Sequence, residues 1–200
     1  MRIFNILRFI AKSSLLYSSS LFGQTNYLIE GNGLLFINQG FGIDFEYKHD
    51  SSLSQGIDFE FFIQNPYNSN GVNAKRNIYT IAPKLRFYFI NDKMEGPFMG
   101  VKVFFTSSNS SISDSDTSST DNFLYFAPTL QIGYRFISEN KFSLSAYIGV
   151  GIKSKNNEFS DAHIPTTKQN NTDWQKAQNK LNLNTSQFQP DYGITFGYIF

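Results

Sequence analysis

The charged residues that could act together occupy alternating positions in short apolar segments. In "GFGIDFEYKH" (40–49) and "GIDFEFFIQ" (56–64), carboxylates alternate with phenylalanine and isoleucine, and later segments place basic residues in the same way. The full set is Asp44, Glu46, Asp58, Glu60, Lys84, Arg86, Lys102, Arg135 and Lys153. Residues two apart on a strand share one face, so these side chains would meet on one side of a sheet. Such a set could relay protons, gate a pore or form ion pairs that close an interior.

Other kinds of chemistry have little support in the composition. The chain has no cysteine, which excludes thiolate metal sites, a cysteine nucleophile and a lipoprotein anchor. Its 2 histidines are too few for a histidine-rich metal site, and we expect no metal and no cofactor. The formal charge of +1 argues against a nucleic-acid partner.

The first residues have the layout of a secretory signal. Arg2, Arg8 and Lys12 precede a short run of apolar and small residues that ends near Gly23. We therefore expect a signal peptide at 1–23 and one domain at 24–200, although an amphipathic N-terminal helix is the alternative. No later apolar run approaches the ~20 residues of a membrane-spanning helix.

Period-two alternation dominates the rest of the chain and predicts about eight strands of roughly 9–13 residues. The segments between them differ in length. Short connections alternate with long ones at about 65–77, 106–122 and 155–187, which is the layout of hairpins in an outer-membrane barrel.

The small residues indicate which face of the strands looks inward. Glycines such as Gly100, Gly133 and Gly149 share the charged face, where a narrow barrel interior needs them. The other face carries bulky Phe, Ile, Leu and Tyr, as a lipid-facing surface would. We predict an all-β, eight-stranded, antiparallel, up-and-down transmembrane barrel whose polar, charged interior is largely closed by ion pairs. A soluble lipocalin-like barrel and a narrow pore are the alternatives.

With these features the chain resembles the small eight-stranded outer-membrane barrels of the OmpA/OmpX type. The ending "DYGITFGYIF" resembles the C-terminal signal that the outer-membrane assembly machinery reads, carried by Tyr192, Ile194, Phe196, Tyr198 and Phe200. The resemblance implies export to the bacterial outer membrane, contact with the bilayer and lipopolysaccharide, and a monomer. It covers nearly all of 25–200 by pattern, and we expect no peptidoglycan-binding domain of the kind that follows the barrel in OmpA.

Because some small barrels act on lipid A, an enzyme must be considered. A barrel deacylase of this kind uses a His and a Ser two apart with a carboxylate, and His49-Asp50-Ser51 has that spacing. It follows the second strand, on the side expected to face the periplasm, so we predict that the protein is not an enzyme. His163, with Glu158, Asp161 and Asp173, could form a metal site, but solvated loop residues are the simpler interpretation.

The last long loop contains a predicted helix, "TDWQKAQNKL" (172–181). Thr172 and Gln175 have the spacing of a capping box, and Trp174, Ala177 and Leu181 have helical spacing. The helix could pack over the barrel mouth, or it could expose Trp174 to a host or extracellular ligand. We predict a structural or surface-interaction role through the long loops.

Overall fold

The protein is a closed barrel of eight antiparallel strands in chain order. The computed structural model describes residues 27–37, 39–48, 52–90, 94–154, 159–160, 163–182 and 187–200. The predicted signal peptide at 1–23 and the triplet His49-Asp50-Ser51 lie outside the described residues. The strands are β1 (Tyr27–Asn32), β2 (Gly40–Lys48), β3 (Leu53–Ser69), β4 (Val72–Tyr88), β5 (Gly96–Ser113), β6 (Ser118–Ile137), β7 (Phe142–Ile152) and β8 (Phe188–Ile199).

The aromatic strand β8 closes the barrel against the first strand. Strand β8 pairs with β1 from Leu28 opposite Ile199 to Asn32 opposite Thr195. The backbone N–H of Phe200 then donates to the carbonyl oxygen of Tyr27 at 2.8 Å. Strand β1 ends at Asn32, and a short helix, α2 (Gly33–Ile37), follows.

The outer surface of the barrel is apolar. Many residues of the predicted outward face are between about one-third and two-thirds exposed; they include Ile81, Leu85, Leu130, Ile132, Ile148, Val150 and Ile194. A soluble protein does not leave so large a continuous apolar surface in water. The surface is the lipid-facing belt of a membrane barrel, and tyrosines such as Tyr79, Tyr134 and Tyr198 lie toward its ends, at the level of the lipid–water boundary.

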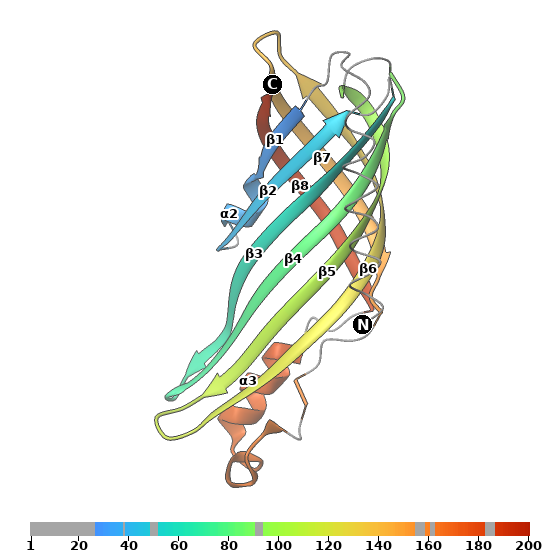
Figure 1. Ribbon diagram of the computed structural model, residues 1–200. Coiled ribbons are helices and arrows are strands. Elements are labelled where there is room, and N and C mark those ends of the chain that lie inside the picture. Colours follow the sequence, from blue (N-terminus) through green and yellow to red (C-terminus); the bar gives the residue numbers. More distant parts are fainter. Residues whose placement is uncertain are drawn as a thin grey trace.

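Four strands continue far beyond this belt. Strands β3, β4, β5 and β6 have 17, 17, 18 and 20 residues, whereas β1, β2, β7 and β8 have 6, 9, 11 and 12. Figure 1 shows them extending past the other strands at the α3 end. On their outer face Asn73, Lys75, Ser107, Thr120 and Asn122 replace the bulky apolar residues. We call this part of β3–β6 the projecting sheet, and its polar outer face places it in water.

The projecting sheet corrects two predicted loops. Residues 65–77 and 106–122 are mostly strand, and they turn at Asn70-Gly71 and at Asp114–Thr117. Asn70 and Gly71 have φ of 52° and 75°, the left-handed conformations of a two-residue hairpin turn. In the second turn, Asp114 Oδ1 accepts from the N–H groups of Asp116 and Thr117. The polar composition suggested loops because a strand outside the bilayer needs no apolar outer face.

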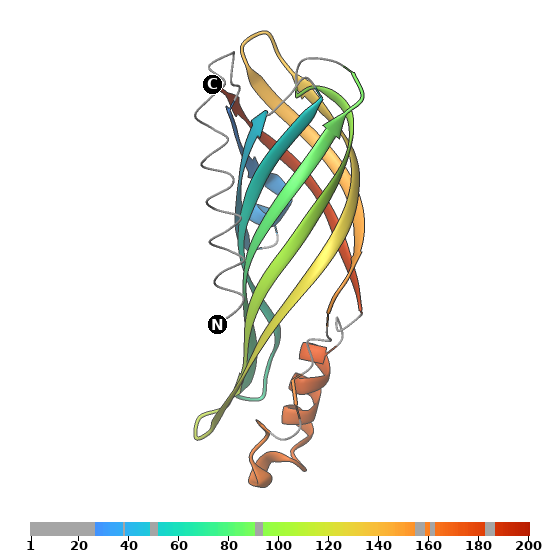
Figure 2. The same cartoon turned by 45° about the vertical axis from the view of Figure 1, so that its right-hand side comes forward.

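The third long loop, which joins β7 to β8, is partly helical. It contains the 3-10 helix η2 (Thr166–Lys168) and the helix α3 (Thr172–Asn182), and Figure 2 shows α3 beside the far end of the barrel. The N-cap of α3 is Asn171 rather than the predicted Thr172, because Asn171 Oδ1 accepts from the N–H groups of Asp173 and Trp174 at 2.9 and 3.2 Å.

No helix among the described residues has the length and hydropathy needed to cross a membrane.

Candidate functional site

The barrel interior is organised around Glu46. Its carboxylate accepts hydrogen bonds from Arg86 at 2.8 Å, from Arg135 at 3.1 and 2.9 Å and from the Tyr88 hydroxyl at 2.7 Å. Ser54 Oγ donates to the same carboxylate at 2.5 Å. Two cations and two hydroxyls therefore share one buried anion, and the network joins β2, β3, β4 and β6.

Two lysines continue the network along the barrel axis. Lys84 contacts Asp44 and lies 2.8 Å from Asp58 Oδ1. Lys102 lies 2.6 Å from Asp58 Oδ2 and 3.3 Å from Glu60 Oε1. Lys84 thus bridges carboxylates from β2 and β3, and Lys102 bridges two carboxylates of β3, which compensates charges that would be costly to bury alone.

Two further acids of the network were missed by the sequence analysis. Glu30 lies 3.0 Å from Arg135 and accepts hydrogen bonds from Ser143 and Thr195 at 2.6 and 2.8 Å. Asp191 lies 3.7 Å from Lys102 and accepts from Gln131 at 2.5 Å. Alternation alone could have found Asp191, which shares its face with Thr195, whereas Glu30 lies on the irregular first strand.

The network leaves little free space. A cavity of about 10 Å³ beside Asp44, Asp58 and Tyr147 is about the size of one water molecule. The guanidinium of Arg86 also lies 4.6 Å from the ring centre of Phe98. The packed side chains of Arg86, Arg135 and Lys102 are almost completely inaccessible to solvent, so they close the interior at this level.

Lys153 is the member of the predicted set that lies elsewhere. It follows β7 at the barrel mouth, and its ammonium group is 5.6 Å from the ring centre of Tyr125. Within the described residues, no carboxylate lies within ion-pair distance of it. The other eight predicted residues all take part in the ion pairs just described.

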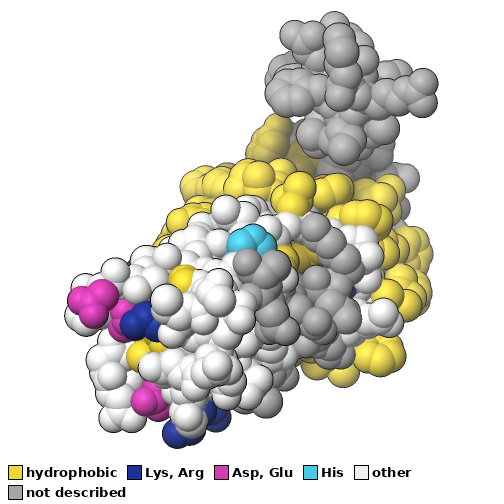
Figure 3. All heavy atoms as spheres, turned by 90° about the horizontal axis from the view of Figure 1, so that it is seen from below, with side chains coloured by type: hydrophobic (Ala, Val, Ile, Leu, Met, Phe, Trp, Pro, Cys, Tyr) yellow, Lys and Arg dark blue, Asp and Glu magenta, His cyan; other side chains and the backbone are white. Residues whose placement is uncertain are grey.

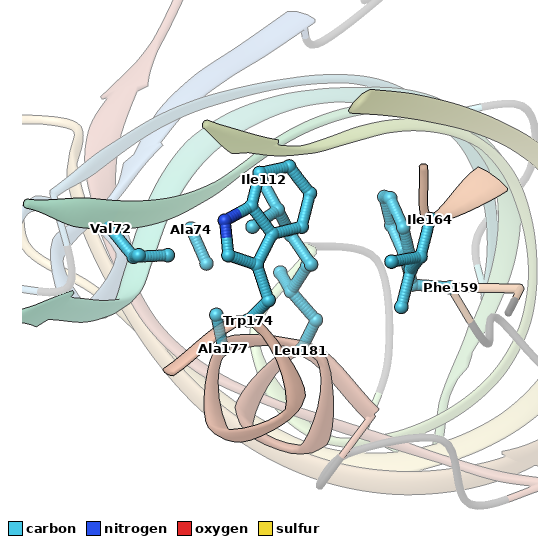
Figure 4. Packing of buried hydrophobic residues seen from close by; sticks show 8 residues of the cluster. All are labelled: Val72, Ala74, Ile112, Phe159, Ile164, Trp174, Ala177 and Leu181. Atoms are coloured by element: carbon cyan, nitrogen blue, oxygen red, sulfur yellow. The ribbon is translucent and has the colours of Figure 1, made fainter. Parts of the chain in front are cut away.

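The structure corrects the assignment of Trp174 as a residue exposed for a ligand. Its side chain is fully buried, and its indole N–H donates to Asp114 Oδ2 at 2.9 Å. Figure 4 shows the indole from α3 among residues of the projecting sheet. Trp174 packs in a cluster with Val72, Ala74, Ile112, Phe159, Ile164, Ala177 and Leu181. The apolar stripe of α3 is therefore used for packing on the inner face of the projecting sheet.

Polar contacts also hold residues 159–182 on the projecting sheet. We call the described part of this segment the cap. Lys168 lies 2.6 Å from Asp114, and its hydrogen bond, with that of Trp174, lowers the pKa of the Asp114 carboxyl. Hydrogen bonds from Tyr67 and Asn70 lower the pKa of Asp173 in the same way. Hydrogen bonds to the carboxyl groups of Asp114 and Asp173, which stabilise their ionised forms, therefore join the cap to the projecting sheet.

The structure does not assemble the suggested metal site at His163. The imidazole Nδ1 lies 3.0 Å from Asp121 on β6, whereas Asp173 contacts Tyr67 and Asn70 on the far side of the cap. Glu158 and Asp161 lie outside the described residues. In the described ranges, no three His, Asp or Glu side chains are placed to share a metal ion.

The residues of the predicted C-terminal signal lie on the lipid-facing side of β8. Tyr192, Ile194, Phe196, Tyr198 and Phe200 are 44–60 % exposed. The rings of Tyr198 and Phe200 contact edge to face, with centres 5.3 Å apart. The stripe is therefore accessible from the membrane side.

Comparison with protein families gives one match over most of the chain. The model described as "Protein of unknown function (DUF3575)" matches residues 7–187. The chain belongs to this family. No match was found among curated proteins.

Solved structures similar to this DUF3575 member are barrels. The crystal structure of Ail, the attachment invasion locus protein of Yersinia pestis, aligns with a TM-score of 0.50 and 9 % identity over 88 % of this chain and 96 % of Ail. Acinetobacter baumannii CarO aligns at 0.44 and 10 %, over 88 % and 97 %. The N-terminal β-barrel domain of Pseudomonas aeruginosa OprF aligns at 0.43 and 11 %, over 88 % and 96 %. The likeness to Ail supports the fold, and the predicted eight-stranded outer-membrane type of barrel is confirmed.

Proposed function

We propose that this protein is an integral outer-membrane barrel that anchors a rigid, water-exposed sheet at the cell surface, with a structural or surface-contact role and no enzymatic activity. The observation that carries this proposal is the change along β4–β6 from an apolar to a polar outer face. Inside the bilayer level the strands present Phe, Leu and Ile outward, and beyond it they present Ser, Asn, Thr and Lys. A strand that crosses this boundary and continues for several residues holds a surface away from the membrane.

The closed interior favours this role over the narrow pore. Conduction needs an aqueous path, whereas Arg86, Arg135 and Lys102 are buried and engaged with carboxylates across the interior. Opening a path would require several buried ion pairs to separate at once, and each unpaired charge would cost several kcal/mol.

The surface available to a partner is polar. Seen from the α3 end, the tip of the molecule is mostly neutral and polar, with a few charged side chains, and hydrophobic side chains appear behind it (Figure 3). We infer that a host or extracellular ligand would meet the outer face of the projecting sheet and the solvent-facing side of α3, rather than Trp174. The assembly machinery would read the C-terminal stripe during insertion.

Lysine labelling of intact cells tests the location and orientation. Lys75 on the projecting sheet and Lys176 and Lys180 on α3 are exposed at one end, while Lys141 is exposed in the β6–β7 turn at the other. A membrane-impermeant amine reagent should label the first three in intact cells and Lys141 only after the outer membrane is opened. The reverse pattern, or recovery of the protein in the soluble fraction, would contradict the proposal.

A further inference from the structure

Strand β1 stops before its two neighbours reach the α3 end of the apolar belt. Strand β8 pairs with β7 as far as Phe188, but with β1 only as far as Thr195. Strand β2 pairs with β3 as far as Gly40, but with β1 only as far as Ile43. Within the described residues no strand lies between the ends of β2 and β8 at this level, and α2 follows β1 instead (Figure 1). We call this interval the β2–β8 gap.

The gap lies in the apolar belt, and the edge of β8 is adapted to it. Tyr192 and Pro190 at this edge lie opposite Ile148 and Val150, which are exposed on the lipid-facing surface of β7. The N–H of Phe200 points toward β1, and every second residue of β8 directs its backbone to the same edge, as far as Pro190. Because proline has no N–H, this position leaves no donor without a partner in the apolar layer.

The short helix α2 fills the β2–β8 gap. It packs against both β2 and β8. Leu35 covers Gly42 of β2, where a Cβ atom would lie 2.5 Å from Leu35 Cδ1. Gly33 lies against Phe196 of β8, where a Cβ atom would lie 2.9 Å from the ring atom Cε1. These contacts involve side chains, whereas neighbouring strands share a ladder of hydrogen bonds. Helix α2 is therefore the part of the wall that can move without breaking a ladder.

A second, larger cavity lies directly behind α2. Its volume is about 830 Å³, within the range of small-molecule sites. The apolar part of its lining includes Leu34, Leu35, Phe62, Ile63, Ile78 and Phe104. Tyr192 also lines the cavity, although it is 59 % exposed on the lipid-facing side of β8. The cavity thus reaches the lipid-facing surface beside α2.

The polar part of the lining suits an uncharged group. Two acids, Glu60 and Asp191, and two bases, Arg76 and Lys153, line the cavity, so its formal charges cancel. The amides of the lining are Asn32, Gln39, Gln64, Asn65 and Gln189. Amide side chains both donate and accept hydrogen bonds. They can meet a hydroxyl group, while the apolar side chains meet a hydrocarbon body.

We propose that α2 gates a lateral portal between β2 and β8, through which an uncharged amphiphile such as a long-chain alcohol passes from the lipid phase into the cavity. A missing strand, a short helix and a cavity occur together at one level of the apolar belt, and this juxtaposition carries the proposal. It goes beyond the proposed surface role, because it assigns a binding site and a route of entry to the barrel wall itself.

Photolabelling of the folded barrel tests the site. The full chain is reconstituted in phosphatidylcholine vesicles with dodecanol that carries a diazirine near the end of its chain, and labelled residues are mapped by peptide mass spectrometry. Phe104 and Phe98 are both inward-facing on β5 and are 5 % and 1 % exposed, and of the two Phe104 lines the cavity. Label on Phe104 should exceed label on Phe98 by roughly an order of magnitude, because close packing excludes the probe from Phe98. Equal label on the two residues would overturn the proposal.

A pair of variants tests α2 as the gate. Leu35→Ala removes the side chain that covers Gly42 and should raise the initial rate of Phe104 labelling several-fold. The control Leu85→Ala removes a leucine that is 50 % exposed on the lipid-facing side of β4, where both neighbouring strands pair, and should be labelled like the wild type. An unchanged rate in Leu35→Ala, or an equal rise in the control, would contradict the gate. Both variants must keep the heat-modifiable gel mobility of a folded barrel, and the comparison of Phe104 with Phe98 in the wild type holds without them.

A water-soluble probe separates the lateral route from entry through the open mouth. A diazirine-bearing glucoside stays in the aqueous phase, so it should label Thr120 and Asn122 on the projecting sheet and label Phe104 less than dodecanol does. Stronger labelling of Phe104 by the glucoside would assign the cavity to the aqueous phase and overturn the portal. Correct lysine labelling of intact cells would leave the proposed surface role standing in any of these cases.

Discussion

Truncating Leu181 at the end of α3 should release the cap from the projecting sheet and leave the barrel intact. Leu181 is 2 % exposed and packs in the cluster with Trp174 and Ile112. This cluster lies outside the membrane, so its stability follows the rules of a water-soluble core. Because Trp174 is the single tryptophan of the chain, its emission reports on the cap alone.

The expected loss follows from the burial of Leu181. A Leu→Ala change at a buried site costs about 2–5 kcal/mol. The helix has 11 residues, and an isolated helix of that length is marginal in water, so α3 depends on this packing. With a denaturant slope of about 1 kcal/mol per molar urea for so small a unit, the midpoint of cap opening should fall by about 2 M or more.

The assay is urea titration of Trp174 emission in neutral detergent, with heat-modifiable gel mobility as the readout for the barrel. In Leu181→Ala the emission should shift to the red at lower urea, or already without urea, while the gel mobility stays that of a folded barrel. The control is Lys180→Ala, an exposed neighbour on the same helix. Superimposable transitions of wild type and Leu181→Ala would refute the conclusion that the cluster holds the cap.

Three further predictions concern the network, the cap and the terminus. Glu46→Ala leaves two buried guanidinium groups without their shared carboxylate and should destabilise the barrel by about 3–5 kcal/mol. The heat-modifiable band should be lost at a lower temperature, without large conductance in planar bilayers. Glu139→Ala in an exposed turn is the control, and equal unfolding midpoints of the two variants would contradict the role of the network. The pKa values of Asp114 and Asp173 are lowered in the fold, so their contribution to the stability of the cap is complete above the ordinary value of 3.8 and is lost as the pH falls through the lower folded values. Trp174 emission should therefore report cap opening on acidification, less steeply in Asp114→Asn. Cap opening on raising the pH would contradict this direction of the pH dependence. Deleting Phe200 should reduce insertion into the outer membrane, measured as the membrane-inserted fraction in cells, and normal insertion would argue against the terminal signal.

The sequence alone determined the class of fold and the orientation of its strands. Asp44 and Glu46 alternate with Phe45, which fits the two-residue period of a strand. Glycines share the charged face, which fits the narrow interior of a small barrel. Eight members of the charged set therefore meet inside the barrel, because the strands direct these side chains inward. The helix in the last loop was also predictable, because Trp174, Ala177 and Leu181 repeat at helical spacing.

Only the tertiary structure decided what lies beyond the membrane level. A polar strand in water and a polar loop have similar compositions, so residues 65–77 and 106–122 gave no sign that β3–β6 continue as a sheet. The spacing of Trp174 showed a stripe but not its partner, which is the inner face of that sheet. Local periodicity sets which way a side chain points, whereas the lengths of neighbouring strands set what it meets.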